Sequence, residues 1–503
     1  MFADKDHSIH TAEGIFVGTV EKSGVISFKG IPFAKPPVGE MRWQPPQPND
    51  PSDLVMYADK FPPAPMQPEM PQALAARLHE APHTPQSEDC LYLNMWCWDV
   101  TTPKKAILFW IYGGSFSIGH ASRLQERGEA LVAENHDLIV VSCNYRLGIF
   151  GSANLSALDP EGTYRYSNNL NLLDQRAALK WVHDNAEAFG GDADRITLYG
   201  HSAGSNAICH RLAIPESNML FQRAICQSSF IVGHGTVPLR AAQDRTMQIL
   251  EKAGVTTLDQ ALSISADKLL AAQAELCGTA YDPPVDDGLT VTSGELERLA
   301  AGELSGKQLL VGNSTGEYDQ MFVGLSAEDA KAKVLSRNAA RLGDQGAEKL
   351  DAFAKLHSDL SEEMAYATAN NELGMTMGGE IQARVCAKYN DVYKFLFAWE
   401  DPKTGARAPH GAPCPFVFNT TVPDTAPISL RYHMLDVWSS FIRTGNPNCD
   451  GLPQWDTYTS EGGPTMVIDN QWTISDSVWT DDYAFWRECF PETAVIEEGK
   501  EGK

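Results

Sequence analysis

The sequence lacks the features that would place it in a membrane or on a nucleic acid. The 503-residue chain has no apolar run of the ~20 residues that a spanning helix needs. Its most apolar stretch, 106–112, ends at Gly113 and Gly114. Positive charge is also scarce, since 40 Lys and Arg residues stand against 65 Asp and Glu residues, for a formal net charge of −25. An acidic chain repels phosphate backbones and anionic lipids, so we expect neither as a partner.

Metal-binding cysteine patterns are also missing. None of the ten cysteines forms a C-x-x-C pair, and their spacing matches no metal site. We therefore expect no metal site built from these cysteines, and mostly reduced thiols. Acids stand near the N-terminus where a signal peptide would be apolar, so we expect a cytoplasmic protein. The oligomeric state stays open, with a monomer among the alternatives.

Buried strands alternate with helices from residue 90 onward. We expect strands over 91–96, 106–111, 138–142, 195–199, 308–312 and 393–398, and helices over 126–134, 172–189 and 202–212. This alternation predicts an α/β fold with a mostly parallel sheet that helices cover. Prolines between 32 and 71 exclude regular helix or central strand there. We expect one domain over 1–491 and a polar tail over 492–503.

The pentapeptide Gly200-His-Ser-Ala-Gly204 fits the pattern G-x-S-x-G. The pattern alone is weak, but here a strand is expected to end at Tyr199 and a helix to begin at Ser202. Strand, sharp turn and helix are the setting of a nucleophile elbow, in which the serine hydroxyl stands above the sheet edge. The sequence therefore predicts Ser202 as a nucleophile. The competing interpretation is a glycine-rich helix start that Ser202 merely caps.

A second glycine-rich segment, Gly113-Gly-Ser115, follows the expected strand 106–111. Glycines let a loop turn its N–H groups toward a substrate oxygen, as in the oxyanion holes of acyl-transfer enzymes. We expect the N–H groups of Gly114, Ser115 and Ala203 to be the donors, with Gly113 supporting them. Without the downstream serine, a plain turn would be the better interpretation.

The expected partners of a serine nucleophile follow it in the order acid, then histidine. Of the later histidines, His410 lies in an irregular loop after strand 393–398, where a catalytic base belongs. His210 is too close to the serine on its own helix, and His357 lies in a charged helical stretch where we expect it to be solvated. Glu317 follows strand 308–312 and is a candidate acid, but spacing alone does not separate it from Asp286, Asp287 and Asp319.

Several blocks in register resemble the type-B carboxylesterase and cholinesterase family of α/β-hydrolases, from about residue 14 to 458. They include the segments 30–39, Glu88-Asp-Cys-Leu-Tyr-Leu-Asn94, Asn144-Tyr-Arg-Leu-Gly148, Gly200–Gly204 and 438–448. The resemblance implies the α/β-hydrolase fold, with helical insertions that form a gorge. It also implies a triad of Ser202, Glu317 and His410, a supporting serine at 228, and a structural ion pair between Glu88 and Arg146.

The implied activity is hydrolysis of small to medium, mainly apolar esters through an acyl-enzyme, and we expect it to need no metal or organic cofactor. Residues 66–89 contain no aromatic residue, so the tryptophan that cholinesterases use to hold a quaternary ammonium is missing. Cys90 is the first cysteine, so the N-terminal disulfide of secreted relatives cannot form. A catalytically silent binding or adhesion protein, or an amidase or acyltransferase with the same triad, is the alternative. Candidate pocket-lining residues, each of which could equally be core, are Phe230, Tyr281, Tyr318, Met321 and Phe322.

Overall fold

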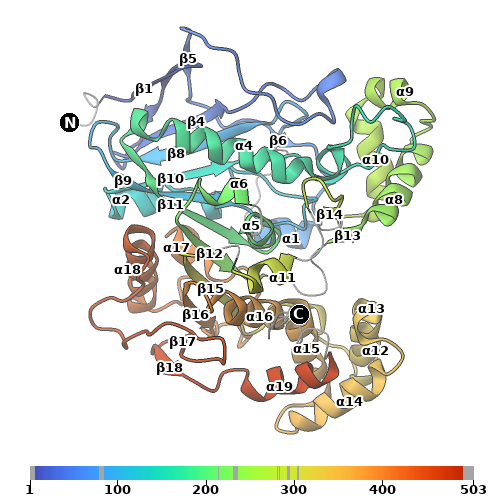
Figure 1. The fold of residues 1–503 in the computed structure, drawn as a ribbon. Coiled ribbons are helices and arrows are strands. Elements are labelled where there is room, and N and C mark those ends of the chain that lie inside the picture. The colour runs from blue at the N-terminus through green and yellow to red at the C-terminus, as the bar shows by residue number, and fades with distance from the viewer. Residues whose placement is uncertain are drawn as a thin grey trace. The chain divides into compact units, whose positions relative to one another are not determined.

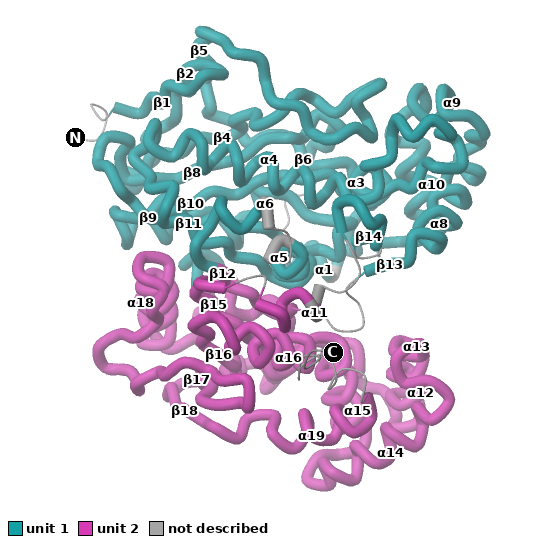
Figure 2. Tube along the Cα trace, in the orientation of Figure 1, with its two compact units in different colours: residues 1–223, 235–293, 417–421 teal, residues 224–234, 294–416, 422–503 magenta. Residues whose placement is uncertain are grey.

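The computed structural model divides into two compact units, coloured separately in Figure 2. Unit 1 comprises residues 1–223, 235–293 and 417–421, and unit 2 comprises residues 224–234, 294–416 and 422–503. The structure describes residues 6–78, 84–212, 215–229, 236–279, 281, 284–291, 295–302 and 305–490. The single domain over 1–491 stays a prediction, and the expected tail 492–503 lies outside the described residues.

Unit 1 contains a twisted sheet whose strands follow the order β11-β9-β10-β8-β4-β3. Strands β11 (Gly191–His201), β9 (Lys105–Ile111) and β10 (Leu138–Cys143) are parallel, as predicted. Strands β8 (Tyr92–Cys97), β4 (Ile26–Pro32) and β3 (Thr19–Val20) continue it in antiparallel fashion. All seven residues of β9 are buried, as its continuous apolar sequence requires of a central strand.

Helices and short strands complete unit 1 (Figure 1). Its helices are α1 (Gln72–Arg77), α2 (Glu129–Glu134), α3 (Gly148–Gly151), α4 (Leu170–Asp184), α5 (Ala203–Leu212), α6 (Pro215–Asn218), α8 (Leu239–Lys252), α9 (Leu258–Ser263) and α10 (Ala266–Cys277). Its small sheets pair β1 (Ser8–Thr11), β2 (Gly14–Val17) and β5 (Val55–Tyr57), then β6 (Ala64–Pro65) with β7 (Gln86–Ser87), and β13 (Val237–Pro238) with β14 (Val285–Asp286).

Unit 2 contains strands in the order β18-β17-β16-β15-β12. Strands β15 (Gln308–Ser314), β16 (Asp391–Phe397) and β17 (Thr465–Ile468) are parallel, and β18 (Thr473–Ser475) is antiparallel to β17. Strand β12 is Arg223–Gln227. The helices are α11 (Glu295–Ala300), α12 (Ala327–Arg337), α13 (Ala339–Leu342), α14 (Gly346–Leu356), α15 (Glu362–Asn371), α16 (Met377–Cys386), α17 (Cys414–Val417), α18 (Ile428–Thr444) and α19 (Thr480–Cys489). A π-helical turn, Glu372–Thr376, joins α15 to α16.

The proline-rich segment 32–71 forms no long element. Within it the structure has the 3₁₀ turn Gly39–Met41 and the short strands β5 and β6. Among the described residues, strand β5 pairs only with β2, at the edge of a small sheet. This agrees with the prediction, because proline cannot donate to a central ladder. No helix in the described part of the chain is long and apolar enough to cross a membrane.

Candidate active site

Ser202 occupies a sharp turn between a strand and a helix of unit 1. Strand β11 ends at His201, and helix α5 begins at Ala203. Ser202 has a positive φ of 58°, a conformation that costs free energy in a residue with a side chain. Its carbonyl accepts the N–H of Asn206 at 2.9 Å, so the helix starts directly from the serine. This is the geometry that the pentapeptide predicts for a nucleophile elbow.

Glycine is required on both sides of that turn. A Cβ on Gly200 would lie 2.4 Å from the backbone of Gly204, and one on Gly204 would lie 2.0 Å from the carbonyl oxygen of Ile111. Real Cβ atoms do not approach backbone so closely, so both positions exclude any side chain. The pattern therefore reflects backbone packing between helix α5 and strands β11 and β9.

The glycine-rich loop 113–115 lies beside the serine. A Cβ on Gly113 would be 2.9 Å from Cβ of Ser202. Gly114 and Ser115 both have positive φ, at 133° and 53°. Among the described residues, no acceptor takes the N–H groups of Gly114 and Ser115. Together with the N–H of Ala203, at the free N-terminal end of α5, they can donate to an oxygen next to Ser202.

Glu317 and His410 form a hydrogen-bonded pair within unit 2. His410 Nδ1 lies 2.5 Å from Oε2 of Glu317, whose side chain is fully buried. The other carboxylate oxygen, Oε1, accepts the hydroxyl of Ser228 at 2.7 Å and the N–H of Ser314 at 2.8 Å. Since a carboxylate only accepts, the proton lies on Nδ1, and Nε2 of a neutral His410 is left as the basic nitrogen.

Neighbouring residues stabilise the positions of Glu317 and His410. The ring of Tyr318 stacks on His410 with centroids 5.6 Å apart, and the backbone N–H of Tyr318 donates to Oδ1 of Asn371 at 2.8 Å. Burial, together with the charge of Glu317, raises the pKa of Tyr318, so its ring stays neutral. Arg407 donates from Nε and Nη2 to the two oxygens of Asp319, at 2.7 and 2.8 Å. That ion pair ties the loop of Glu317 to the loop of His410.

Comparison with known proteins identifies the family. Residues 5–486 match the model described as the carboxylesterase family. This chain belongs to the carboxylesterase family. It is 32% identical to the para-nitrobenzyl esterase of Bacillus subtilis over 93% of this chain and 96% of that protein. It is 30% identical to the fumonisin B1 esterase of Sphingopyxis macrogoltabida over 90% of this chain and 85% of that protein.

Solved structures give the same assignment. A carboxylesterase of Geobacillus stearothermophilus matches with a TM-score of 0.83 at 33% identity, covering 95% of this chain and all of that one. A PNB esterase structure matches with a TM-score of 0.82 at 31% identity, covering 95% and 99%. The carboxylesterase therefore has the α/β-hydrolase fold that the sequence predicted, and it is a serine carboxylic ester hydrolase.

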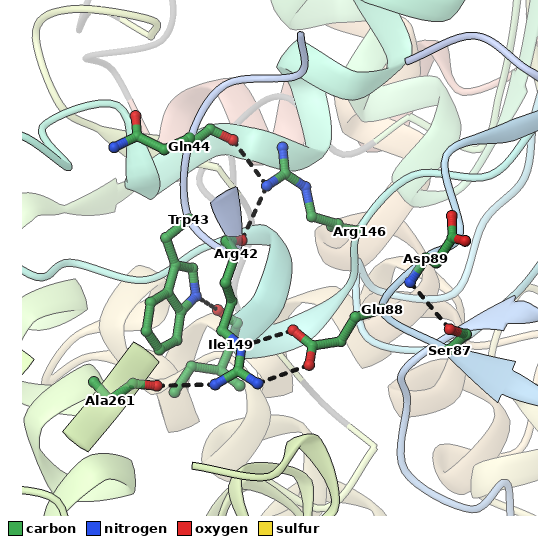
Figure 3. A network of polar contacts seen from close by, with 9 residues as sticks. All are labelled: Arg42, Trp43, Gln44, Ser87, Glu88, Asp89, Arg146, Ile149 and Ala261. Atoms are coloured by element: carbon green, nitrogen blue, oxygen red, sulfur yellow. Dashed lines mark hydrogen bonds and ion pairs between the residues drawn. The ribbon is translucent and has the colours of Figure 1, made fainter. Parts of the chain in front are cut away.

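The predicted ion pair between Glu88 and Arg146 is wrong for this carboxylesterase. The two oxygens of Glu88 accept Nε and Nη2 of Arg42, at 2.6 and 2.7 Å (Figure 3). Arg146 instead donates to both oxygens of Asp174, at 2.8 and 2.7 Å. Its Nη1 donates to the backbone carbonyls of Arg42 and Gln44, so the two pairs are neighbours but not partners (Figure 3). Each carboxylate therefore pairs with the guanidinium that donates to both of its oxygens.

The remaining candidate residues have the following surroundings within their own units. Tyr281 packs in the core of unit 1 and donates to the carbonyl of Ser152 at 2.7 Å. Phe322 is buried and Met321 is half-buried. His357 was expected to be solvated, but its Nε2 lies 2.7 Å from Oδ1 of Asp482 and only 20% of its side chain is exposed. Phe230 lies outside the described residues.

Proposed function

We propose that this carboxylesterase hydrolyses small to medium, mainly apolar esters with Ser202 as nucleophile, His410 as general base and Glu317 as the acid that orients it. The observation that carries the proposal is the hydrogen bond between His410 Nδ1 and Glu317, because it leaves Nε2 to take a proton. The positive φ of Ser202 at the strand–helix turn supports its role.

The proposed reaction proceeds through an acyl-enzyme. His410 removes the proton from Ser202 as Oγ attacks the carbonyl carbon, and the N–H groups of Gly114, Ser115 and Ala203 stabilise the oxyanion. His410 then protonates the leaving alcohol. Water, deprotonated by the same imidazole, attacks the acyl-enzyme. The bond between the carbonyl carbon and Oγ then breaks, the imidazolium returns its proton to Ser202, and the carboxylic acid leaves. Ser228 and the N–H of Ser314 keep Glu317 in place through its other oxygen.

We also propose a reducing, cytoplasmic compartment. All ten cysteines are free thiols, and seven of them are buried. Thiols of this kind persist where glutathione and thioredoxin keep cysteine reduced.

The test uses p-nitrophenyl esters of increasing acyl length, with the wild type, Ser202→Ala and a control at an exposed serine, Ser460→Ala. We expect turnover by the wild type and the control, and a loss of at least about 10³-fold in Ser202→Ala. The acyl length that gives the highest turnover indicates the size of the acyl pocket. Equal turnover by all three proteins would refute the assignment of Ser202.

A fluorophosphonate probe separates the alternative functions. A silent binding protein on this fold would give neither turnover nor labelling. An acyltransferase or amidase would be labelled at Ser202 but would pass the acyl group to added alcohol or amine in preference to water. We expect the probe to label the wild type but not Ser202→Ala. We also expect the acyl group to pass to water in preference to added alcohol or amine.

A further inference from the structure

A cluster outside the proposed active site joins three potential metal ligands in unit 2. His357, Glu372 and Asp482 each offer one ligand atom, and these atoms lie within 4.8 Å of one another. The residues come from the end of α14, the start of the π-helical turn and helix α19. Their wide separation in the sequence explains why no ligand spacing was visible and no metal was expected.

In the part of the chain that the structure describes, no Lys or Arg forms a direct ion pair with the two acids of this cluster. Glu372 is fully buried and Asp482 is 7% exposed. Glu372 Oε2 accepts Nε1 of Trp486 at 2.6 Å, whereas no N–H or O–H group among the described residues donates to its Oε1. A buried carboxylate oxygen without a partner costs free energy unless a proton or a cation neutralises it.

The two carboxylates are buried and close together, so they repel each other when both are ionised. A divalent cation would remove this repulsion, because two carboxylates and a neutral imidazole balance its charge. The alternative is a proton shared between the two acids, with His357 paired to Asp482.

We propose that His357, Glu372 and Asp482 bind one first-row divalent metal ion, of which Zn²⁺ is the best fit. One imidazole and two carboxylates form a donor set that suits zinc, cobalt or manganese, whereas magnesium and calcium prefer oxygen alone. Three atoms within 4.8 Å of one another fit around a centre that lies at most about 2.8 Å from each. Metal bonds of ~2.1 Å therefore need a contraction of at most roughly 0.7 Å. The partly exposed His357 gives an ion a route from solvent.

The ion would stabilise the turn that supports the acid–base pair. Glu372 begins the π-helical turn, and Gly374 lies in the same turn. Gly374 packs against the ring of Tyr318, since a Cβ added to Gly374 would lie 2.9 Å from a ring carbon. Tyr318 in turn stacks on His410. Asn371, directly before Glu372, donates to Asp319 at 2.7 Å. The proposed role is therefore structural, and it does not depend on the assignment of Ser202.

The test measures metal binding by the full chain after chelator treatment and dialysis. Titration with Co²⁺ should give one equivalent with visible d–d absorption, without the thiolate charge-transfer band that cysteine ligation would add. Competition with Zn²⁺ should displace the cobalt. We expect His357→Gln and Asp482→Asn to weaken binding about tenfold or more, and the neighbouring control Asp481→Asn, whose side chain is exposed, to leave it unchanged.

Two results would overturn the site. One is the absence of stoichiometric cobalt binding by the folded wild type, which would favour the shared proton. The other is equal binding by the wild type, His357→Gln and Asp481→Asn, which would place the ion elsewhere. Thermal melts with and without Zn²⁺ guard against misfolded variants, since only a protein that binds the ion in its native state gains stability from it.

Discussion

His410 Nδ1 and Glu317 Oε2 are 2.5 Å apart, and the carboxylate has no exposed surface. Glu317 accepts two further hydrogen bonds, from Ser228 and from the backbone of Ser314, so it cannot rotate away from the imidazole. A fully buried carboxylate with three donors holds one tautomer of the histidine. A proton-transfer step therefore requires both that this group stay fixed and that it only accept, so that Nδ1 keeps its proton.

Glu317→Gln tests that requirement. An amide keeps the shape of the side chain but can donate to Nδ1, which allows the wrong tautomer. We expect kcat on p-nitrophenyl esters to fall by about 10³- to 10⁴-fold, with the melting temperature little changed. A loss smaller than tenfold would show that the orientation of His410 does not depend on Glu317. Ser202 should still react slowly with a fluorophosphonate probe.

Gly204→Ala tests the backbone packing behind the elbow. The added methyl group would lie 2.0 Å from the carbonyl oxygen of Ile111. We expect a loss of more than about 3 kcal/mol in the free energy of unfolding, or no folded protein at all. The control is Gly254→Ala, where φ is +77° and no atom lies within 4 Å of the new Cβ. That change should cost only about 1 kcal/mol, from the left-handed backbone. Urea unfolding measures the free energy of unfolding of both variants. Equal losses in the two variants would contradict the close contact between position 204 and Ile111.

Double-mutant cycles test the corrected ion pairs. The pairs Arg42–Glu88 and Arg146–Asp174 should each show a coupling free energy of about 1–3 kcal/mol in unfolding experiments. The formerly expected pair, Glu88 with Arg146, should show less than about 0.5 kcal/mol, because the two side chains share no hydrogen bond. Glu88→Gln, Asp174→Asn, Arg42→Met and Arg146→Met supply the variants. A strong coupling between Glu88 and Arg146 would restore the original prediction.

Glu380→Gln tests the pH dependence of stability. Burial alone would raise the pKa of Glu380, but Lys394 at 2.9 Å and Arg384 at 2.7 Å lower it below its ordinary value. Stability from a depressed pKa is complete above the unfolded value of about 4.5, and it is lost as the pH falls through the folded pKa. The wild type should therefore exceed the variant by about 3–5 kcal/mol at pH 7.

That difference should shrink as the pH falls below about 4.5, since protonated Glu380 resembles glutamine. Glu348→Gln is the control, because Glu348 is exposed on helix α14. It should change stability by less than about 0.5 kcal/mol at every pH. A constant gap between wild type and Glu380→Gln would contradict the assigned ion pairs.

The local parts of the site were predictable from the sequence. The elbow depends on five consecutive residues whose backbone demands are visible in their glycines, and strand, turn and helix all form where the pattern placed them. The helix expected over 172–189 is less regular, because α4 ends at Asp184 and a separate 3₁₀ turn, Ala186–Phe189, follows. The apolar spacing continues through that break, so hydrophobic periodicity could not reveal it.

Partner choice across long sequence distances was not predictable. Spacing could not separate Glu317 from its neighbour Asp319, and only the family resemblance favoured it. The structure gives the two acids different partners, His410 for Glu317 and Arg407 for Asp319. His357 and Asp482 are in contact although 125 positions separate them in the sequence, and only tertiary packing creates such a contact. Long-range ion pairs carry no local signal, which is also why the partner of Glu88 was misassigned.

The π-helical turn Glu372–Thr376 is in effect a one-residue insertion in a continuous helix from 362 to 386. Deleting a single residue there would restore α-helical geometry and leave the residues after the turn close to their present phase, whereas deleting one residue from α15 would rotate them by about 100°. After the deletion from α15, Glu380 would leave Lys394, and the face of α16 now buried would turn toward other surroundings. Alignments across this helix must therefore place any one-residue gap inside the turn.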